Sequence, residues 1–402
     1  MLLSLFTPTH RTRHLYDTYQ SILRQSYRNF EWIIVPNGKR PGPIPEPLLD
    51  DERVKVVSGG EHIKTIGGLK RYACHMASGD AFIELDHDDY LMPGDTLTRL
   101  ADAFQGGAGF VYSDSAAFVE PKLQAHQYAP SHGWEAYKID IYGRPLYASR
   151  TFEITPRSLA EIYYCPDHVR AWSREAYYRA GGHNSKLVVC DDHQLMIKTY
   201  LSGAKFEHMG GCYYVYRMFP GNTVKAKQPD IRRICAENKK EFSGELIKEW
   251  CRRHDHAYVN LGEWMEEGWK FERDLFDGFG DDVGAIYCDV LQFCPPERVN
   301  EFFNVAYQSL RPGGYIDIKT PSTNGQAAFL DPTFKSRFNP ASFLLYTRRS
   351  LASMNPQINC RYQYMVGFEY YPTDFHEEYD FKYAVVRLCA LKGQRQPGLQ
   401  HI

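Results

Sequence analysis

Short apolar runs and stretches with helical spacing alternate along the first 110 residues of the chain. The apolar runs have the length of buried strands and lie at residues 2–6, 31–35, 54–58 and 81–85. Helix-like stretches lie between them at residues 14–25 and 68–77. Strands separated by helices at this spacing predict a mostly parallel sheet that is buried on both faces. Because ligands bind beyond the carboxyl ends of the strands in such sheets, the residues that follow each strand are the first candidates for function.

Three carboxylates in four residues follow the fourth predicted strand, in Asp86-His87-Asp88-Asp89. Neighbouring carboxylates repel one another, so this cluster needs a counter-charge or full contact with solvent. One interpretation is a solvated turn that caps a helix. The other is a divalent metal that bridges the carboxylates and a diphosphate, because hard oxygen ligands suit Mg²⁺ or Mn²⁺.

The middle of the chain has a weaker pattern. Residues 120–165 are irregular and aromatic, which is typical of an insertion that faces a substrate. Asp191 and Asp192 begin a helix-like stretch that continues to Leu201, and acidic residues favour such a helix start. From residue 225 to about residue 256 the chain is strongly charged, and we expect a helical connector there.

A second α/β pattern begins near Tyr258. It predicts a strand at residues 284–291, an amphipathic helix at 296–310, a turn at 311–314 and a strand at 315–320. Two closing strands are expected at residues 362–365 and 383–391. With 402 residues, the chain is long enough for two or three domains.

Composition narrows the class of protein. Lys and Arg number 47 and Asp and Glu 49, so the net charge of -2 excludes a globally basic nucleic-acid coat. No apolar run approaches the ~20 residues that span a bilayer. The start of the chain has no basic leader and no cleavage site of small residues, so we expect no signal peptide. Ten scattered cysteines without a C-x-x-C pair indicate reduced thiols in a soluble, cytoplasmic protein.

Three motifs occur in order in the first half of the chain. They are FTPTHRT at residues 6–12, SILRQSYRNFEWIIVPNG at 21–38 and ASGDAFIELDHDD at 77–89. Together they resemble the family 2 glycosyltransferases of the GT-A fold, over residues 1–225. The resemblance implies transfer of a sugar from a nucleotide diphosphate donor with inversion at the sugar carbon.

The resemblance also implies roles for individual residues. Thr7, Pro8 and Thr9 are expected to line the nucleotide, and Lys70 is expected to touch the diphosphate. Asp86 and Asp88 are the implied metal-binding pair, for Mn²⁺ or Mg²⁺. The full set of implied donor-binding residues is Thr7, Pro8, Thr9, Arg11, Asn37, Lys70, Asp86 and His87.

The chain departs from the family pattern at two positions. Asn37 stands where the family has an Asp after the second strand, so an amide is expected at the donor base, and a UDP-sugar stays the favoured donor. In YRMFPGNT at residues 216–223, Phe219 stands where the family often has a His near the metal. A metal held by fewer protein ligands is expected to bind more weakly or to depend on the donor.

The stretch CDDHQL at residues 190–195 resembles the family's Glu-Asp-x-Asp-Leu motif, in which the second acid accepts the proton of the attacking hydroxyl. General-base work needs a carboxylate within hydrogen-bond reach of the acceptor, and a helix start in a cleft supplies one. We therefore expect Asp192 to be the catalytic base, with Asp191 as its support or as the alternative base. The competing interpretation is that both acids only cap a helix.

Several histidine and aromatic residues have two interpretations. His87 and His193 are flanked by acids, but a single His is more often a polar contact than a ligand. The run His254-Asp255-His256 fits a solvated linker better than a metal site. Two interpretations are also open for the aromatic residues of the 120–165 region: they form a platform for the acceptor, or they pack within loops. These residues are Trp134, Tyr137, Tyr142 and Tyr147.

Residues 274–394 resemble the later part of a class I methyltransferase, the fold that uses S-adenosylmethionine, above all in LRPGG at 310–314. Cofactor binding in that family needs a glycine-rich turn after the first strand, where the backbone approaches the ligand closely. The candidate turn, VNLGEW at residues 259–264, has the single glycine Gly262, and too few residues separate it from Asp274. Gln292 and Phe293 replace the family's Glu-His. The expectation is a trimmed fold that binds no S-adenosylmethionine and instead packs, dimerises or holds the acceptor.

Taken together, these patterns predict an α/β protein with a GT-A glycosyltransferase domain at residues 1–225 and a charged helical linker at 226–257. A degenerate, truncated Rossmann-like domain of the methyltransferase type is expected at 258–394. The predicted activity is metal-dependent, inverting transfer from a UDP-sugar to a hydroxyl of a glycan or of a hydroxymethylated base in DNA. A catalytically silent binding or scaffold protein and a bifunctional glycosyltransferase–methyltransferase are the alternatives. A homo-oligomer formed through the C-terminal domain is compatible with this organisation.

Overall fold

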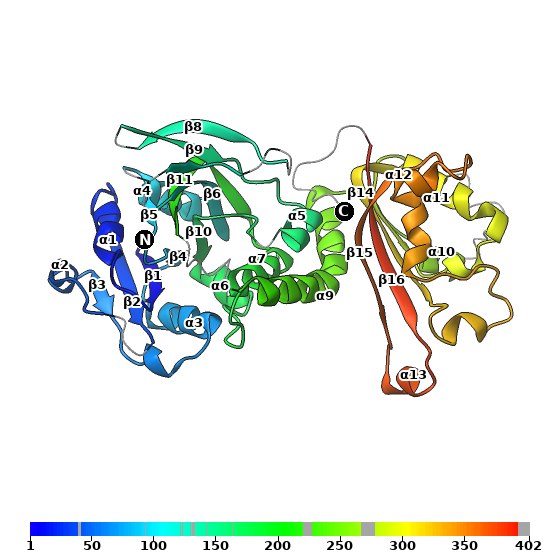
Figure 1. The fold of residues 1–402 in the computed structure, drawn as a ribbon, viewed down its shortest axis with the longest axis horizontal. Coiled ribbons are helices and arrows are strands. Elements are labelled where there is room, and N and C mark those ends of the chain that lie inside the picture. Colours follow the sequence, from blue (N-terminus) through cyan, green and yellow to red (C-terminus); the bar gives the residue numbers. More distant parts are fainter. Residues whose placement is uncertain are drawn as a thin grey trace. The chain divides into compact units, whose positions relative to one another are not determined.

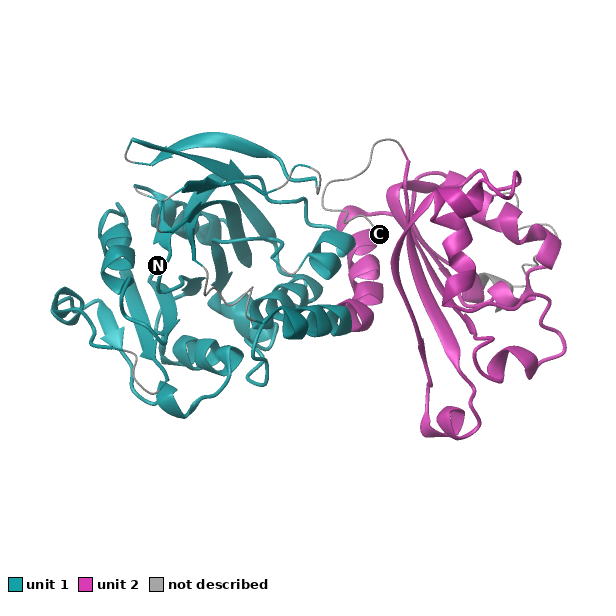
Figure 2. Ribbon diagram, in the orientation of Figure 1, with its two compact units in different colours: residues 1–238, 397–402 teal, residues 239–396 magenta. Residues whose placement is uncertain are grey.

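The structure is a computed structural model. It describes residues 1–38, 42–92, 94–120, 122, 124–128, 130, 133–141, 143–162, 164–219, 227–266 and 278–392. The chain divides into two compact units (Figure 2): unit 1 is residues 1–238 with 397–402, and unit 2 is residues 239–396. None of the helices in the described ranges is both long enough and apolar enough to cross a membrane.

Unit 1 is built on one large mixed sheet (Figure 1). Its strands are β1 Leu3–Thr9, β2 Phe30–Pro36, β3 Val54–Val56, β4 Ala81–Glu84, β5 Tyr90–Leu91, β6 Phe110–Val119, β7 Gln124–His126, β8 Ala136–Ile141, β9 Arg144–Ser149, β10 Arg170–Ser173 and β11 Phe206–Met218. Its helices are α1 Leu15–Leu23, α2 Glu46–Leu49, α3 Ile66–Met76, α4 Thr96–Gln105, α5 Pro156–Glu161, α6 Arg174–Arg179 and α7 Asp191–Leu201, with a short 3-10 helix at Gly60–His62. The long helix α9 Gln228–His254 begins in unit 1, and the boundary between the units falls within it.

The sheet order is β3-β2-β1-β4-β10-β6-β11-β5, and the four strands predicted in the first 110 residues are its parallel half. Strand β10 breaks the predicted pattern because it runs antiparallel to both neighbours, β4 and β6. Successive side chains of a strand point to opposite faces, so Leu5 packs with α1 and α4, whereas Phe6 packs with α3 and α7. The prediction of a sheet buried on both faces is confirmed.

The region of residues 120–165 is more regular than the sequence predicts. Strands β8 and β9 form an antiparallel hairpin, β9 pairs with β6, and α5 follows. Apolar side chains on one face of the hairpin, such as Leu146 and Ile139, pack with Phe118 of β6. The prediction of an irregular insertion was wrong because these strands are short and are stabilised by pairing with distant residues.

Unit 2 has a smaller five-stranded sheet in the order β12-β13-β14-β16-β15. Its strands are β12 Tyr258–Asn260, β13 Val283–Cys288, β14 Leu310–Pro321, β15 Tyr362–Tyr370 and β16 Tyr383–Ala390. Its helices are the rest of α9, α10 Leu261–Glu266, α11 Val299–Ser309, α12 Arg349–Ala352 and α13 Asp374–Glu378, with 3-10 helices at Leu291–Phe293, Pro296–Arg298, Ala327–Phe329 and Pro340–Tyr346.

The elements predicted in unit 2 are mostly observed. The first three strands are parallel, and β16 runs antiparallel to β14 and β15. The turn expected at residues 311–314 lies inside β14, where Gly313 has a φ of 77°. The strand expected at 284–291 ends at Cys288, and Leu291, the last residue of the expected strand, belongs to a 3-10 helix. Ile286, Phe302 and Ile316 belong to one buried cluster, so this unit has its own hydrophobic core.

Candidate active site

The acid-rich loop after β4 is held in place by the end of β11. The Asp86 backbone N–H donates to Tyr214 Oη at 3.1 Å, and Tyr214 Oη donates to Asp89 Oδ2 at 2.9 Å. The Arg217 backbone N–H donates to Asp89 Oδ1 at 2.8 Å, and Arg217 Nε donates to the Asp88 carbonyl oxygen at 2.8 Å. The loop therefore has a fixed shape that does not depend on its own sequence alone.

The three carboxylates of this loop have different environments. Asp89 is fully buried, and burial together with Asp88 and Asp86 raises its pKa well above the ordinary value. Its oxygens accept the hydrogen bonds from Tyr214 and Arg217, so Asp89 is part of the framework. Asp88 is 9% exposed and Asp86 is half-buried, and they are the two acids that remain at the surface of the site.

Asp86 and Asp88 fit the chemistry of a small divalent cation. Burial and the neighbouring Glu84 raise the pKa of Asp86 to about 7, although Lys70 acts in the opposite direction. These crowded acids lack a full counter-charge, which a cation supplies. Within the described ranges no group of three His, Cys, Asp or Glu side chains has the arrangement of a metal cage. Mg²⁺ and Mn²⁺ are commonly held by one or two carboxylates plus substrate phosphates, and this pair meets that requirement.

Lys70 lies in a buried network of charges below the loop. Its Nζ donates to Glu84 Oε1 at 2.7 Å and lies 3.6 Å from Asp191 Oδ2. Burial alone lowers the pKa of Lys70, but Asp191 and Glu84 outweigh it and raise the pKa well above the ordinary value. The contact of Lys70 with a diphosphate stays a prediction; in this structure its ammonium binds two carboxylates of the protein.

Lys70→Met is expected to lower the free energy of unfolding by about 3–5 kcal/mol, because it leaves Glu84 and Asp191 buried without their cation. Denaturant unfolding measures this loss. Lys205→Met is the control, since Lys205 pairs with Glu207 at 2.8 Å while 58% exposed and should change stability little. Normal stability of Lys70→Met combined with weakened donor binding would contradict the framework role and support the diphosphate contact.

The two acids at the start of α7 differ in exposure. The Asp191 side chain is 2% exposed, and its Oδ2 lies 2.8 Å from His183 Nδ1. The Asp192 side chain is 20% exposed and pairs with the Arg170 guanidinium. Burial would raise the pKa of Asp192, but Arg170 and Lys70 outweigh it and hold the pKa below its ordinary value. Asp192 is therefore the ionised carboxylate that reaches solvent, and Asp191 is internal.

The residues predicted at the nucleotide meet at the carboxyl ends of β1 and β2. The Asn37 N–H donates to the Thr9 carbonyl oxygen at 2.8 Å, and the Arg11 N–H donates to Thr9 Oγ1 at 3.2 Å. Pro8 lies opposite Val35 in the register of β1 with β2. The Thr7 hydroxyl is internal, since it donates to the Leu85 carbonyl oxygen at 2.6 Å and accepts from Trp32 Nε1.

His87 joins the carboxyl end of β1 to the acid-rich loop. Its ring packs edge-to-face on His10, which follows β1, with 5.3 Å between ring centroids. Its Nε2 lies 3.9 Å from Asp88 Oδ2. Burial lowers the pKa of His87, so the neutral form is favoured. The structure thus brings Thr9, Arg11, Asn37 and His87 to the same edge of the sheet as the acid pair, whereas Thr7 and Lys70 are internal.

Sequence reasoning missed four residues of this site: Glu84, Arg170, Tyr214 and Arg217. Arg170 lies opposite Glu84 in the β10–β4 register, and its side chain is 4% exposed. A charged residue at the start of the apolar run RAWS, and an acid inside the predicted strand at 81–85, were signals that both side chains have partners. Of the motif at 216–223, Asn222 and Thr223 lie outside the described residues.

Several of the remaining candidates make contacts within the protein. His193 Nε2 lies 2.6 Å from the Leu159 carbonyl oxygen, which confirms a polar contact. Trp134 stacks on Tyr128 and Tyr164, and Tyr137 Oη donates to Asp114 Oδ2 at 2.9 Å, so packing accounts for both. Tyr142 lies outside the described residues, and Tyr147 is half-buried in β9. The His254 and His256 rings stack beside Trp250 at the end of α9.

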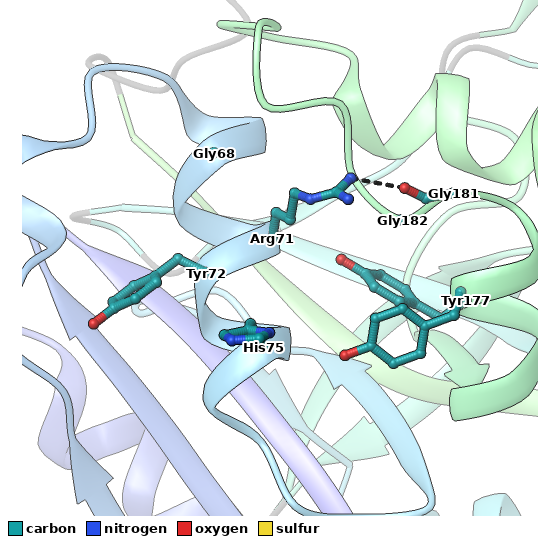
Figure 3. Close-up of a pocket in the computed structure, with 8 residues that line it drawn as sticks. Gly68, Arg71, Tyr72, His75, Tyr177, Gly181 and Gly182 are labelled. Atoms are coloured by element: carbon teal, nitrogen blue, oxygen red, sulfur yellow. Dashed lines mark hydrogen bonds between the residues drawn. The ribbon is translucent and has the colours of Figure 1, made fainter.

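A pocket of about 280 Å³ lies against α3 (Figure 3), and no residue of the acid-rich loop lines it. It is lined by Gly68, Arg71, Tyr72, His75, Tyr177, Tyr178, Gly181 and Gly182. Arg71 Nη1 crosses it to donate to the Gly181 carbonyl oxygen at 2.7 Å. This contact, with a second one to the His183 carbonyl oxygen, fixes the loop that leads into α7. None of the predicted site residues lines the pocket.

The sheet and its acid-rich edge define unit 1 as a mixed α/β domain with a curled sheet, consistent with a GT-A glycosyltransferase domain. Residues 4–179, somewhat less than half of the chain, match the family model described as Glycosyl transferase family 2. This match supports glycosyl transfer as the activity of unit 1.

Among solved structures, the chain is similar to residues 1–349 of TarS from S. aureus. The identity is 14%, the match covers 77% of this chain and 80% of that chain, and the TM-score is 0.42. The same fragment in complex with UDP-GlcNAc is similar with 13% identity, 76% and 80% coverage and a TM-score of 0.44. A comparison with curated proteins finds no match.

Proposed function

We propose that unit 1 transfers a sugar from a nucleotide diphosphate donor to an acceptor hydroxyl, with a divalent cation and with inversion. The observation that carries the proposal is the joint placement of the Asp86–Asp88 pair and the ionised Asp192. Asp86 and Asp192 lie close enough for the charge of Asp192 to raise the pKa of Asp86. Both carboxylates also raise the pKa of Lys70, which is the cation beside them. The match of residues 4–179 to Glycosyl transferase family 2 supports the same activity.

In this proposal Asp86 and Asp88 hold Mg²⁺ or Mn²⁺, which neutralises the charge of the donor diphosphate when it is bound. Thr9, Arg11 and Asn37 at the ends of β1 and β2 bind the nucleotide. A UDP-sugar is the proposed donor, because the Asn37 amide can both donate to and accept from a uracil edge.

Asp192 accepts the proton of the acceptor hydroxyl. As the new C–O bond forms, the hydroxyl oxygen gains positive charge and its proton becomes strongly acidic. A carboxylate of low pKa therefore suffices, and the pairing with Arg170 keeps Asp192 ionised and in one position. Attack from the face opposite the leaving diphosphate inverts the sugar carbon.

The proposed acceptor is a glycan. The other predicted acceptor, a hydroxymethylated base in DNA, needs a basic surface. Helix α9 has seven Lys or Arg against five Asp or Glu, and several of these charges pair within the helix, as in Arg233–Glu237, Lys248–Glu245 and Arg252–Glu249, so it offers only a weakly basic surface. Modified DNA is kept as one arm of the acceptor test, in which binding should weaken steeply with salt.

The test is a thermal-shift screen of nucleotide sugars with and without Mn²⁺, followed by turnover assays with polysaccharide and hydroxymethylated DNA acceptors. Stabilisation by one UDP-sugar that needs Mn²⁺, together with hydrolysis or transfer of its sugar, supports the proposal. If no donor stabilises the protein and no donor is hydrolysed, the catalytically silent scaffold is favoured instead.

For unit 2 we propose a packing role in a trimmed methyltransferase-type fold. Gly262, the candidate for the cofactor turn, has an internal explanation: a Cβ there would lie 2.6 Å from Asp289 Oδ1. Strand β12 has only three residues and leads directly into α10. Asp274 and the side chain of Trp264 lie outside the described residues. The homo-oligomer expected through this unit is tested by size-exclusion chromatography of the full chain.

We expect no binding of S-adenosylmethionine to the full chain, because the one glycine of the turn is already in contact with Asp289 and cannot also approach a ligand. Isothermal titration calorimetry is the direct measurement. Heat of binding with a dissociation constant in the low micromolar range would contradict the packing role and revive the bifunctional alternative.

A further inference from the structure

Two cysteine thiols meet beside the candidate catalytic acids. Cys190 immediately precedes Asp191 and Asp192, and Cys235 lies in the first part of α9. Their Sγ atoms are 3.7 Å apart, and both residues belong to unit 1. All ten cysteines of the chain lie in the described ranges, and all are free thiols. The sequence shows ten scattered cysteines, and the fold brings this pair together.

The backbone of Cys190 has an uncommon conformation. Its φ is 57°, in the left-handed region that residues with a side chain rarely adopt. Residues held in such conformations concentrate at functional sites, where the surrounding structure maintains them. Here the residue with this conformation directly precedes α7, and its thiol lies beside Cys235 of α9.

The two thiols differ in reactivity. Contacts with Cys190 and His193 outweigh the effect of burial and lower the pKa of Cys235 to about 6, whereas the contact with Cys235 and burial raise the pKa of Cys190. His193 Nδ1 lies 3.9 Å from Cys235 Sγ, and its Nε2 lies at the Leu159 carbonyl oxygen. Cys235 is half-buried, and Cys190 is 8% exposed. Cys235 is therefore the accessible nucleophile, and Cys190 is its protected neighbour.

We propose that Cys190 and Cys235 are a redox modification site, at which a reversible disulfide pins α9 to the start of α7 and displaces Asp191 and Asp192. The effect on turnover rests on the proposed function of unit 1. Formation of the disulfide does not.

The oxidant is a small disulfide, RSSR. The Cys235 thiolate attacks one sulfur of RSSR, which forms a mixed disulfide and releases RS⁻. The Cys190 thiol then loses its proton and attacks Cys235 Sγ, so that the intramolecular S–S bond forms and a second thiolate leaves. Overall, two protein thiols and RSSR give one protein disulfide and two RSH.

The displacement follows from geometry. An S–S bond is about 2.05 Å long, so the two sulfurs must approach by roughly 1.7 Å from their present separation. Cys190 is bonded directly to Asp191, and the contact of Asp192 with Arg170 allows little freedom. A shift of about 1 Å at a catalytic group can reduce a rate up to 100-fold. We expect turnover to fall roughly 10-fold to 100-fold in the oxidised protein, with donor affinity changed much less.

The test exposes the full chain to oxidised glutathione and maps the peptides by mass spectrometry. The expected product links the peptides that carry Cys190 and Cys235, with loss of two hydrogen atoms, and dithiothreitol reverses it. Cys235→Ser should abolish the link. Cys251→Ser, a buried cysteine of the same helix, should leave it intact. Glutathione retained on Cys235 without transfer to Cys190, or a link between other cysteines, would overturn the proposal.

A second measurement compares turnover before and after oxidation in the native protein and in Cys235→Ser. Loss of turnover only in the native protein supports the displacement of the acids. Full turnover of the linked protein overturns it. Because the peptide map needs no enzymatic activity, absence of transfer in the reduced protein counts against the proposed function alone.

Discussion

Asp88→Asn is expected to abolish sugar transfer and the metal dependence of donor binding. The Asp88 carboxylate is one of two charges that offset the cation, and an amide oxygen is a far poorer partner. The backbone carbonyl of residue 88 still accepts from Arg217 Nε in the variant, so the loop should keep its shape. Calorimetric titration of the donor, with Mn²⁺ and with EDTA, measures the effect.

Asp102→Asn is the matched control, since Asp102 is an exposed acid on α4 and lies outside the acid-rich loop. It should retain both transfer and the difference between the Mn²⁺ and EDTA titrations. Donor affinity in Asp88→Asn that still depends on Mn²⁺ as in the native protein would overturn the metal assignment.

Asp192→Asn is expected to leave donor affinity near normal and to cut turnover by roughly 10²–10⁴-fold, the usual range for loss of a general base. The amide cannot accept the proton of the attacking hydroxyl. Because Arg170 and Lys70 hold the pKa of Asp192 below its ordinary value, protonation of Asp192 should not reduce the native rate at mildly acidic pH. Steady-state kinetics as a function of pH measure both effects.

Asp191→Asn gives the contrast. Asp191 is internal and contacts Lys70 and His183, so its loss should reduce stability more than the chemical step. If Asp191→Asn loses turnover and Asp192→Asn keeps it, Asp191 is the catalytic base and Asp192 its support. Activity in both variants would place the base elsewhere.

The sequence locates the edge of the site because a run of acids after an apolar strand is visible without a structure. It also predicts the bounds of α7 well, since the Asp191–Asp192 pair stands at the N-terminus of that helix. The run of acids alone does not separate Asp88 from Asp89; only the family resemblance singles out Asp86 and Asp88. Burial makes the difference, and burial depends on Tyr214 and Arg217, which come from a strand much later in the chain.

Lys70 shows the same limit from another direction. The family resemblance places it at the diphosphate, but its partner Glu84 lies inside a strand whose pattern is otherwise apolar. Pairing between distant elements decides such contacts, as it does for the hairpin β8–β9, whose strand β9 lies against β6. Local patterns predict elements and their order, and these long-range pairings need coordinates.

The support of the acid-rich loop by β11 affects how the motif should be recognised in other chains. In Asp86-His87-Asp88-Asp89 the last residue has a packing role, because the Asp89 carboxylate accepts hydrogen bonds from the Arg217 N–H and from Tyr214 Oη. An Asn at that place can seat its oxygen on the N–H and its amide on the tyrosine hydroxyl, which has two acceptor positions. A search that demands three aspartates would therefore reject chains that keep the proposed metal pair, and a search that demands only the first and third aspartates would retain them.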